Sequence, residues 1–241
     1  MEGDKYTPPT SMESAGESTA PPVSPFQALV GVFFNPRKTF ESLAAKPSFL
    51  LPLILLILAQ AAFALVVFHS GAVKSDAIAK MEAQGKPPEV VAAMEKFFDS
   101  PAAPVIGAVS ALVVVAFIVL VNAALVFFVG NLMLGARLTF KHYLCTTIFS
   151  GVVALVDLVA RAALILTKGT MDVRLGLGNL LGDDPGYLGR LLDTVTNPLI
   201  LWATAVSAIG VSVFAKKSFG FGVLAVLPGF LLMALMSGMH G

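Results

Sequence analysis

Two ionisable residues, Asp157 and Arg161, lie inside a stretch of the chain (143–166) that is otherwise apolar. Their spacing places both side chains on one face of a helix, where they can form an ion pair. A charge near the centre of a bilayer costs about 2.5–3.5 kcal/mol on insertion scales, and such residues often belong to ion or substrate pathways. The sequence leaves two interpretations open: a structural clasp in which Asp157 neutralises Arg161, or a binding or transport site.

Three amide side chains also lie in apolar stretches: Gln60, Asn122 and Asn131. Buried amides between membrane helices usually hydrogen-bond to a neighbouring helix, and each such bond contributes about 0.6–2 kcal/mol. We therefore expect these residues to be interhelical polar contacts.

No arrangement of residues predicts an enzyme or a cofactor site. The single Cys145 lies in an apolar stretch, and His69, His142 and His240 have no second ligand at metal-binding spacing. Motifs of the G-x-S-x-G, H-E-x-x-H, P-loop and CxxC types are absent. We expect a non-enzymatic protein that has no metal and no cofactor.

Composition indicates which elements must hold these residues. Hydrophobic residues make up 56% of the 241 and charged residues 13%, against about 25% charged in soluble domains. Mean hydropathy is +0.84, so a soluble fold would expose more apolar surface than water tolerates. The net charge of +1 gives no reason to expect a nucleic-acid partner.

Five apolar stretches each supply the roughly 20 residues that cross a bilayer core of about 30 Å. One of them, 100–136, has no charged residue and could hold two short helices. A single long, tilted helix also fits its length, and we favour it because no strong turn signal interrupts the stretch. The sequence predicts an all-α integral membrane protein with transmembrane helices at about 49–68, 105–134, 143–166, 198–215 and 219–239.

Three regions follow from the pattern. Residues 1–23 are rich in Pro, Ser, Thr and Glu and predict a disordered cytoplasmic tail. Residues 24–46 predict an amphipathic interfacial helix, broken at Asn35-Pro36, that lies in the headgroup plane beside basic residues; its first apolar face would be Phe26, Leu29, Val30 and Phe33. Residues 47–241 form the five-helix domain, with two surface helices expected in 70–99 and a loop with one short helix in 167–195.

The distribution of Lys and Arg predicts the orientation. With five spans, the 137–142 connection and the 216–218 turn lie on the same face as the N-terminus, and both are short and basic. Short loops rich in Lys and Arg remain in the cytoplasm. We expect a cytoplasmic N-terminus and a C-terminus on the other side.

Several short segments, taken in order, resemble the Yip family of Ypt/Rab-interacting multi-pass membrane proteins, and specifically its bacterial branch. They are Asn35-Pro36-Arg37-Lys38-Thr39-Phe40, Gly135-Ala136-Arg137-Leu138-Thr139-Phe140-Lys141 and Asn197-Pro198-Leu199-Ile200-Leu201-Trp202. The resemblance covers roughly residues 25–240 and implies five membrane helices with a cytoplasmic N-terminus. Eukaryotic relatives are associated with vesicle traffic, membrane shaping and Rab GTPases, but their Asp-Leu-Tyr-Gly-Pro motif is absent here, so a GTPase partner is not implied.

Two functions from different classes follow. The first is a non-enzymatic membrane protein that organises the membrane or partner proteins. Its expected partners are the lipid bilayer and either further copies of the chain, in a homo-oligomer, or another membrane protein. The alternative is a small transporter or lipid translocator built around Asp157 and Arg161. The bacterial resemblance places either one in the inner (cytoplasmic) membrane.

Overall fold

The computed structural model describes residues 24–182 and 186–239, and within these ranges the chain forms helices and no strand. The expected disordered tail at 1–23 lies outside the described residues, as does His240. The prediction of an all-α fold is confirmed for the part of the chain that the structure describes.

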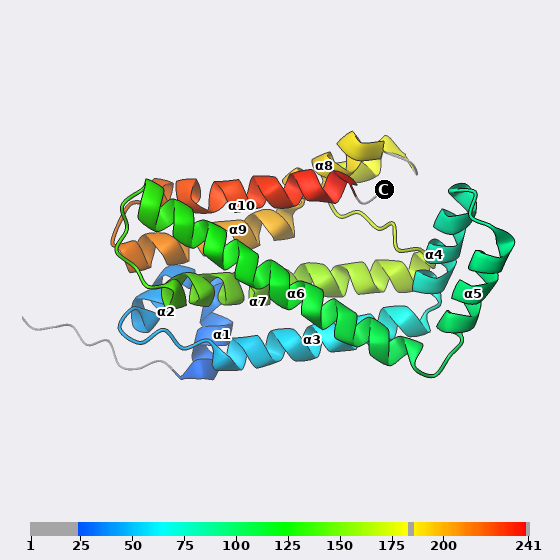
Figure 1. Ribbon diagram of the computed structural model, residues 1–241. Helices are drawn as coiled ribbons and strands as arrows, with labels where there is room; N and C mark the ends of the chain where they lie inside the picture. Colours follow the sequence, from blue (N-terminus) through cyan, green and yellow to red (C-terminus); the bar gives the residue numbers. More distant parts are fainter. Residues whose placement is uncertain (1–23, 183–185, 240–241) are drawn as a thin grey trace, which may run out of the picture.

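Five helices are long and apolar enough to cross a membrane. They run side by side along the length of the molecule (Figure 1). The second is continuous, because α6 passes directly into the π-helical segment η1, which confirms the single long helix favoured from the sequence. These spans are α3 (Leu50–His69), α6 with η1 (Ala103–Phe127 and Phe128–Met133), α7 (Phe140–Lys168), α9 (Pro198–Ala215) and α10 (Phe219–Met239).

The shorter helices and the connections divide between the two ends of the bundle (Figure 1). One end, which we call the amino end, carries α1 and α2 with the α6–α7 and α9–α10 connections. The opposite end, the carboxyl end, carries α4, α5, η2 and α8. Bounds of these elements are Pro25–Phe34 (α1), Pro36–Leu43 (α2), Ala72–Ala83 (α4), Pro88–Phe98 (α5), Leu177–Leu181 (η2) and Gly186–Thr196 (α8).

Local capping explains how the chain enters the bundle. Ser24 caps α1 in a reciprocal arrangement, in which the Ser24 hydroxyl accepts from the Gln27 amide and the Gln27 side chain accepts from the Ser24 amide. The side chain of Asn35 accepts a hydrogen bond from the Lys38 amide and so caps α2, whose first residue is Pro36. A proline is harmless there because its missing N–H has no partner inside the helix.

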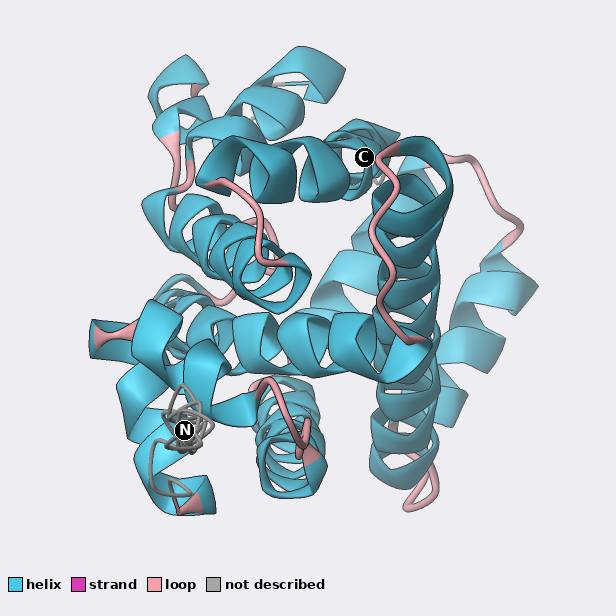
Figure 2. Ribbon diagram, turned by 90° about the vertical axis from the view of Figure 1, so that its left-hand side faces the viewer, coloured by secondary structure: helices cyan, strands magenta, loops and turns pink. Residues whose placement is uncertain are grey.

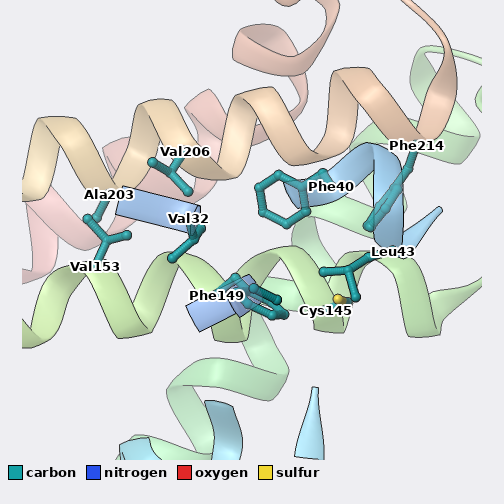
Figure 3. Close-up of a cluster of buried hydrophobic side chains, with 10 residues drawn as sticks. Val32, Phe40, Leu43, Cys145, Phe149, Val153, Ala203, Val206 and Phe214 are labelled. Carbon is teal, nitrogen blue, oxygen red and sulfur yellow. The ribbon is translucent and has the colours of Figure 1, made fainter. Parts of the chain in front are cut away.

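The pair α1–α2 is anchored in the core of the bundle. The Phe40 ring is fully buried and meets Phe149 of α7 and Phe214 of α9 edge-on, with ring centroids 5.9 and 5.5 Å apart. Figure 3 shows these side chains converging from α2, α7 and α9, with Val32 of α1 beside them. Figure 2 shows the molecule from this amino end.

The side of α1 that faces the bundle agrees only in part with the expected apolar face. Ala28 and Val32 are the buried residues of α1, whereas Phe26 and Val30 are exposed. Because α1 is apolar around most of its circumference, sequence periodicity could not choose between its faces. The small side chains of Ala28 and Val32 permit close approach to the bundle. Leu29 and Phe33, from the expected face, pack partly buried beside them.

Candidate functional site

The Asp157–Arg161 pair lies on the carboxyl-end half of α7. The Arg161 Nε donates to the Asp157 Oδ2 at 2.7 Å, and the two side chains are 26% and 12% exposed. The charges are therefore largely withdrawn from the surface of the bundle. Breaking such a pair leaves the remaining charge without compensation, which is costly in a low-dielectric interior.

Asn197 completes the coordination of the Asp157 carboxylate from a second helix. Its Nδ2 donates to the Asp157 Oδ1 at 2.6 Å. Its Oδ1 accepts from the backbone amides of Leu199 and Ile200 at 2.9 and 3.4 Å, which caps α9. The cap fixes the amide orientation, so one buried residue both starts α9 and ties it to α7.

The Arg161 guanidinium reaches the segment between α7 and α8. Its Nη1 donates to the Val173 carbonyl at 3.0 Å, and its Nη2 lies 4.0 Å from the Asp193 Oδ2 on α8. The other oxygen of Asp193 accepts from the Gly176 amide at 2.6 Å. The resulting network of Asp157, Arg161, Asp193 and Asn197 joins α7, α8, α9 and the segment before η2.

Glycines allow that segment to lie directly on α8. A Cβ on Gly176 would overlap the backbone carbonyl of Asp193, and one on Gly178 would overlap the carbonyl of Gly189. The Leu177 amide also donates to the Thr196 hydroxyl at 2.8 Å. The glycine-rich sequence, which predicts loop structure, is thus needed for close backbone contact.

The network forms part of the wall of a cavity of about 490 Å³ at the carboxyl end. Arg174 in this wall is itself paired with Asp172 and donates to the Gly182 carbonyl at 2.6 Å. Four acidic and four basic residues line the cavity: Asp76, Asp157, Asp172 and Asp193 with Lys80, Arg161, Arg174 and Arg190. Within the described ranges no cluster of three or more His, Cys, Asp or Glu could hold a metal ion.

Comparison with protein families decides what kind of bundle this is. The model of the Yip1 domain matches residues 30–239, which takes in all five long helices. The chain belongs to the Yip1 family. Searches of curated proteins and of solved structures found no match.

Within the Yip1 domain, Asn131 stands where η1 meets the connection to α7. Its Nδ2 donates to the Leu138 carbonyl at 2.7 Å, and its Oδ1 accepts from the Leu138 amide at 3.3 Å and from the Tyr143 hydroxyl at 2.8 Å. The side chain therefore closes the turn and holds it against α7.

The other two amides of the Yip1 domain lie apart from Asn131 and from the Asp157 network. Asn122 on α6 faces Gly229 of α10, where a Cβ would come within 3.3 Å of the Asn122 Oδ1. Gln60 lies on α3 and lines a groove between α3, α6 and α7. The three amides thus lie at three separate places in the bundle, and they do not form one polar site.

Sequence reasoning identified Asp157 and Arg161 but missed their partners in the Yip1 domain. The Asn197-Pro198 pair is a recognisable helix start, yet nothing in it indicates that the amide reaches a carboxylate forty positions earlier in the chain. Asp193 falls in the segment 167–195, where the sequence predicts a loop with one short helix and gives no sign of burial, although the residue is 5% exposed. Helix packing brings these residues together, and short-range spacing carries no signal of it.

Proposed function

We propose that this Yip1 protein is a non-enzymatic membrane organiser that acts through its amino end on the lipids of one leaflet and on neighbouring membrane proteins. The observation that carries the proposal is the placement of α1 and α2. They lie across the end of the bundle, with an anchored inner side and an exposed apolar outer side (Figure 1). A helix pair with an exposed apolar side, held at this level, inserts into the headgroup region and widens one leaflet relative to the other.

The exposed side of α1 has the chemistry of such a wedge. Phe26 and Phe34 are 70% and 85% exposed, although water would penalise both rings. The anchored side, through Val32 and Phe40, fixes the depth of the pair relative to the spans. The insertion depth is therefore set by the bundle and not by the helix alone.

The charge of the amino end supports a preference for anionic lipids. Within the described residues this end has a single acidic residue, Glu41, and the following basic ones: Arg37, Lys38, Lys46, Arg137, Lys141, Lys216 and Lys217. Each basic residue near an anionic surface contributes about 1 kcal/mol. The same distribution supports a cytoplasmic amino end, and the resemblance to bacterial members supports the inner membrane.

The bonding of the Asp157 network favours a clasp over a transport site. Both carboxylate oxygens of Asp157 accept hydrogen bonds, and the Arg161 Nε and Nη1 both donate. A group that binds a solute needs unsatisfied donors or acceptors, and a bonded network instead holds its helices in place.

Vesicle shape tests the wedge. We would reconstitute the wild type and the double variant Phe26→Ser/Phe34→Ser into phosphatidylcholine vesicles containing phosphatidylglycerol, and measure vesicle diameters by electron cryomicroscopy. The wild type should give smaller, more curved vesicles, and the variant should lose most of this effect. Phe97→Ser is the matched control, since Phe97 is an exposed ring at the carboxyl end. Equal diameters for all three proteins would refute the proposal.

The cavity of mixed charge favours one alternative, a small transporter or lipid translocator. Its lining of acids and bases could accept a zwitterionic or ionic solute. This alternative expects proteoliposomes to move a solute or lipid, and Asp157→Asn to abolish that movement while the protein still inserts. Such turnover by the wild type would replace the organiser proposal.

A further inference from the structure

One polar side chain lies in an apolar groove at the middle of the membrane-spanning part of the bundle. The groove, of about 460 Å³, lies between α3, α6 and α7. Every residue that lines it is apolar except Gln60. Its rim residues Ile57, Val113 and Leu120 are exposed, so the groove opens on the lipid-facing surface.

The position of Gln60 is energetically unfavourable in an isolated chain. Gln60 lies near the midpoint of α3, as far as possible from the headgroups at either end of that helix. None of the described residues forms a hydrogen bond with its amide. Transfer of an unpaired amide from water to hydrocarbon costs on the order of 4–8 kcal/mol, so a lipid acyl chain is a poor occupant for this place.

The occupant must therefore bring a polar group to the depth of Gln60. A second copy of the chain in the same orientation does so automatically, because a twofold axis along the membrane normal places identical residues at identical depth. The carboxamide has both a donor and an acceptor, so two of them can pair with each other. We infer that this groove is a homodimer interface in which the Gln60 amides of two copies hydrogen-bond to each other.

The shape of α3 fits this role. Leu53, Ile57 and Gln60 follow i, i+4, i+7 spacing, and all three line the groove. Such a row forms a ridge that packs into the groove of a facing helix. Gln60 then fixes the register of an otherwise apolar contact, as interhelical amides do in membranes. This dimer does not depend on the wedge at the amino end.

Cysteine cross-linking tests the interface in the full chain. Ile57→Cys places a thiol on the rim of the groove and leaves Gln60 unchanged. Leu58→Cys is the control: Leu58 is the next residue in the sequence and is 63% exposed, but it does not line the groove. Cys145 is completely buried, so the wild type measures background. After oxidation in phosphatidylcholine vesicles, Ile57→Cys should give a disulfide dimer several times more abundant than that of Leu58→Cys.

A second variant assigns the effect to the amide. Gln60→Leu keeps the groove filled with an apolar side chain of similar size and removes the polar pair. It should weaken dimerisation on the order of ten-fold, since interhelical hydrogen bonds contribute about 0.6–2 kcal/mol. Single-molecule photobleaching over a series of lipid dilutions measures the dimer fraction. A thermal midpoint no lower than that of the wild type, measured at a lipid dilution at which both proteins are monomeric, would show that the Gln60→Leu monomer remains folded.

Three results would overturn the inference. Equal cross-linking of Ile57→Cys and Leu58→Cys would indicate random collision. A dimer insensitive to Gln60→Leu would show that another surface holds it. A protein that stays monomeric at every lipid dilution, with a lipid or an unrelated polypeptide bound in the groove, would identify a different occupant.

Discussion

Asn197 shows how much one side chain can hold together inside a membrane bundle. It caps α9 through its oxygen and binds Asp157 of α7 through its nitrogen. Asn197 is completely buried by protein, and a helix start without access to water needs a protein acceptor for its free N–H groups. The Asn197 oxygen is that acceptor. Because helix packing brings α7 alongside, the Asn197 nitrogen also holds the Asp157 carboxylate in place.

The first prediction concerns that pair. Asp157→Ala should lower the free energy of unfolding by about 3 kcal/mol, because it leaves the largely buried Arg161 with a single, more distant carboxylate, that of Asp193 at 4.0 Å. Arg37→Ala is the matched control: Arg37 also pairs with an acid one helical turn away, Glu41, but the two side chains are 79% and 52% exposed. It should cost less than about 1 kcal/mol. Denaturation in detergent micelles, followed through the single Trp202, measures both, and equal effects would contradict a structural role for the pair.

The second prediction concerns a strained residue at the amino end. Lys216 has a φ of 52°, the single positive φ outside glycine in the described chain. It ends α9, a place where glycine is normally favoured because it has no Cβ.

Lys216→Gly should therefore raise the free energy of unfolding by about 1 kcal/mol, which is measured as a higher thermal midpoint. Lys217→Gly removes the same charge from a residue outside the left-handed region, and it should give no gain. A rise for both variants would attribute the effect to charge, and a rise for neither would show that the strain is compensated elsewhere.

At the scale of elements, the contact between α9 and α10 depends on the absence of a side chain. A Cβ on Gly222 would overlap the backbone of Ala208 on the facing helix. Membrane helices associate through small residues because close backbone approach maximises their van der Waals contact. The sequence shows glycines at both 220 and 222, but it does not show which of them contacts the facing helix.

The third prediction separates the two glycines of this hairpin. Gly222→Ala should destabilise the protein by about 1–3 kcal/mol, because the helices must move apart. At Gly220 the nearest atom to an added Cβ is the Ser218 hydroxyl oxygen at 3.9 Å. Gly220→Ala should therefore be neutral or slightly stabilising through its higher helix propensity. Thermal unfolding distinguishes them, and two neutral substitutions would mean that the helices are not in close contact.

At the scale of the whole molecule, five long helices place the α6–α7 and α9–α10 connections together and α4, α5 and α8 opposite them (Figure 1). The two ends differ in chemistry. The amino end is basic with one described acid, whereas the charged residues around the carboxyl-end cavity are equally divided. Such a difference biases insertion toward one orientation.

The fourth prediction is this orientation. Alkaline phosphatase and green fluorescent protein, fused in turn to each terminus in bacterial cells, should report a cytoplasmic N-terminus and a C-terminus on the opposite side. Replacing Arg137, Lys141, Lys216 and Lys217 with Gln should produce a mixed population, because the short-loop positive charge is then lost. Both termini reporting from one compartment would contradict a five-span arrangement.

The sequence alone determined the family, the all-α membrane class and the five spans. These depend on summed properties: about 20 consecutive apolar residues cross a bilayer whatever their neighbours are, and an ordered set of short segments identified the Yip relationship. The spacing of Asp157 and Arg161 also sufficed to nominate the pair, because one helix sets their distance.

Only the tertiary structure decided which residues meet across helices. It placed Asn197 and Asp193 beside the ion pair, turned Ala28 and Val32 of α1 inward, and left Gln60 in an apolar groove. In hydrocarbon an apolar helix face has nearly the same solvation facing lipid as facing protein. Periodicity therefore carries little information about which face is inside, and packing geometry makes that choice.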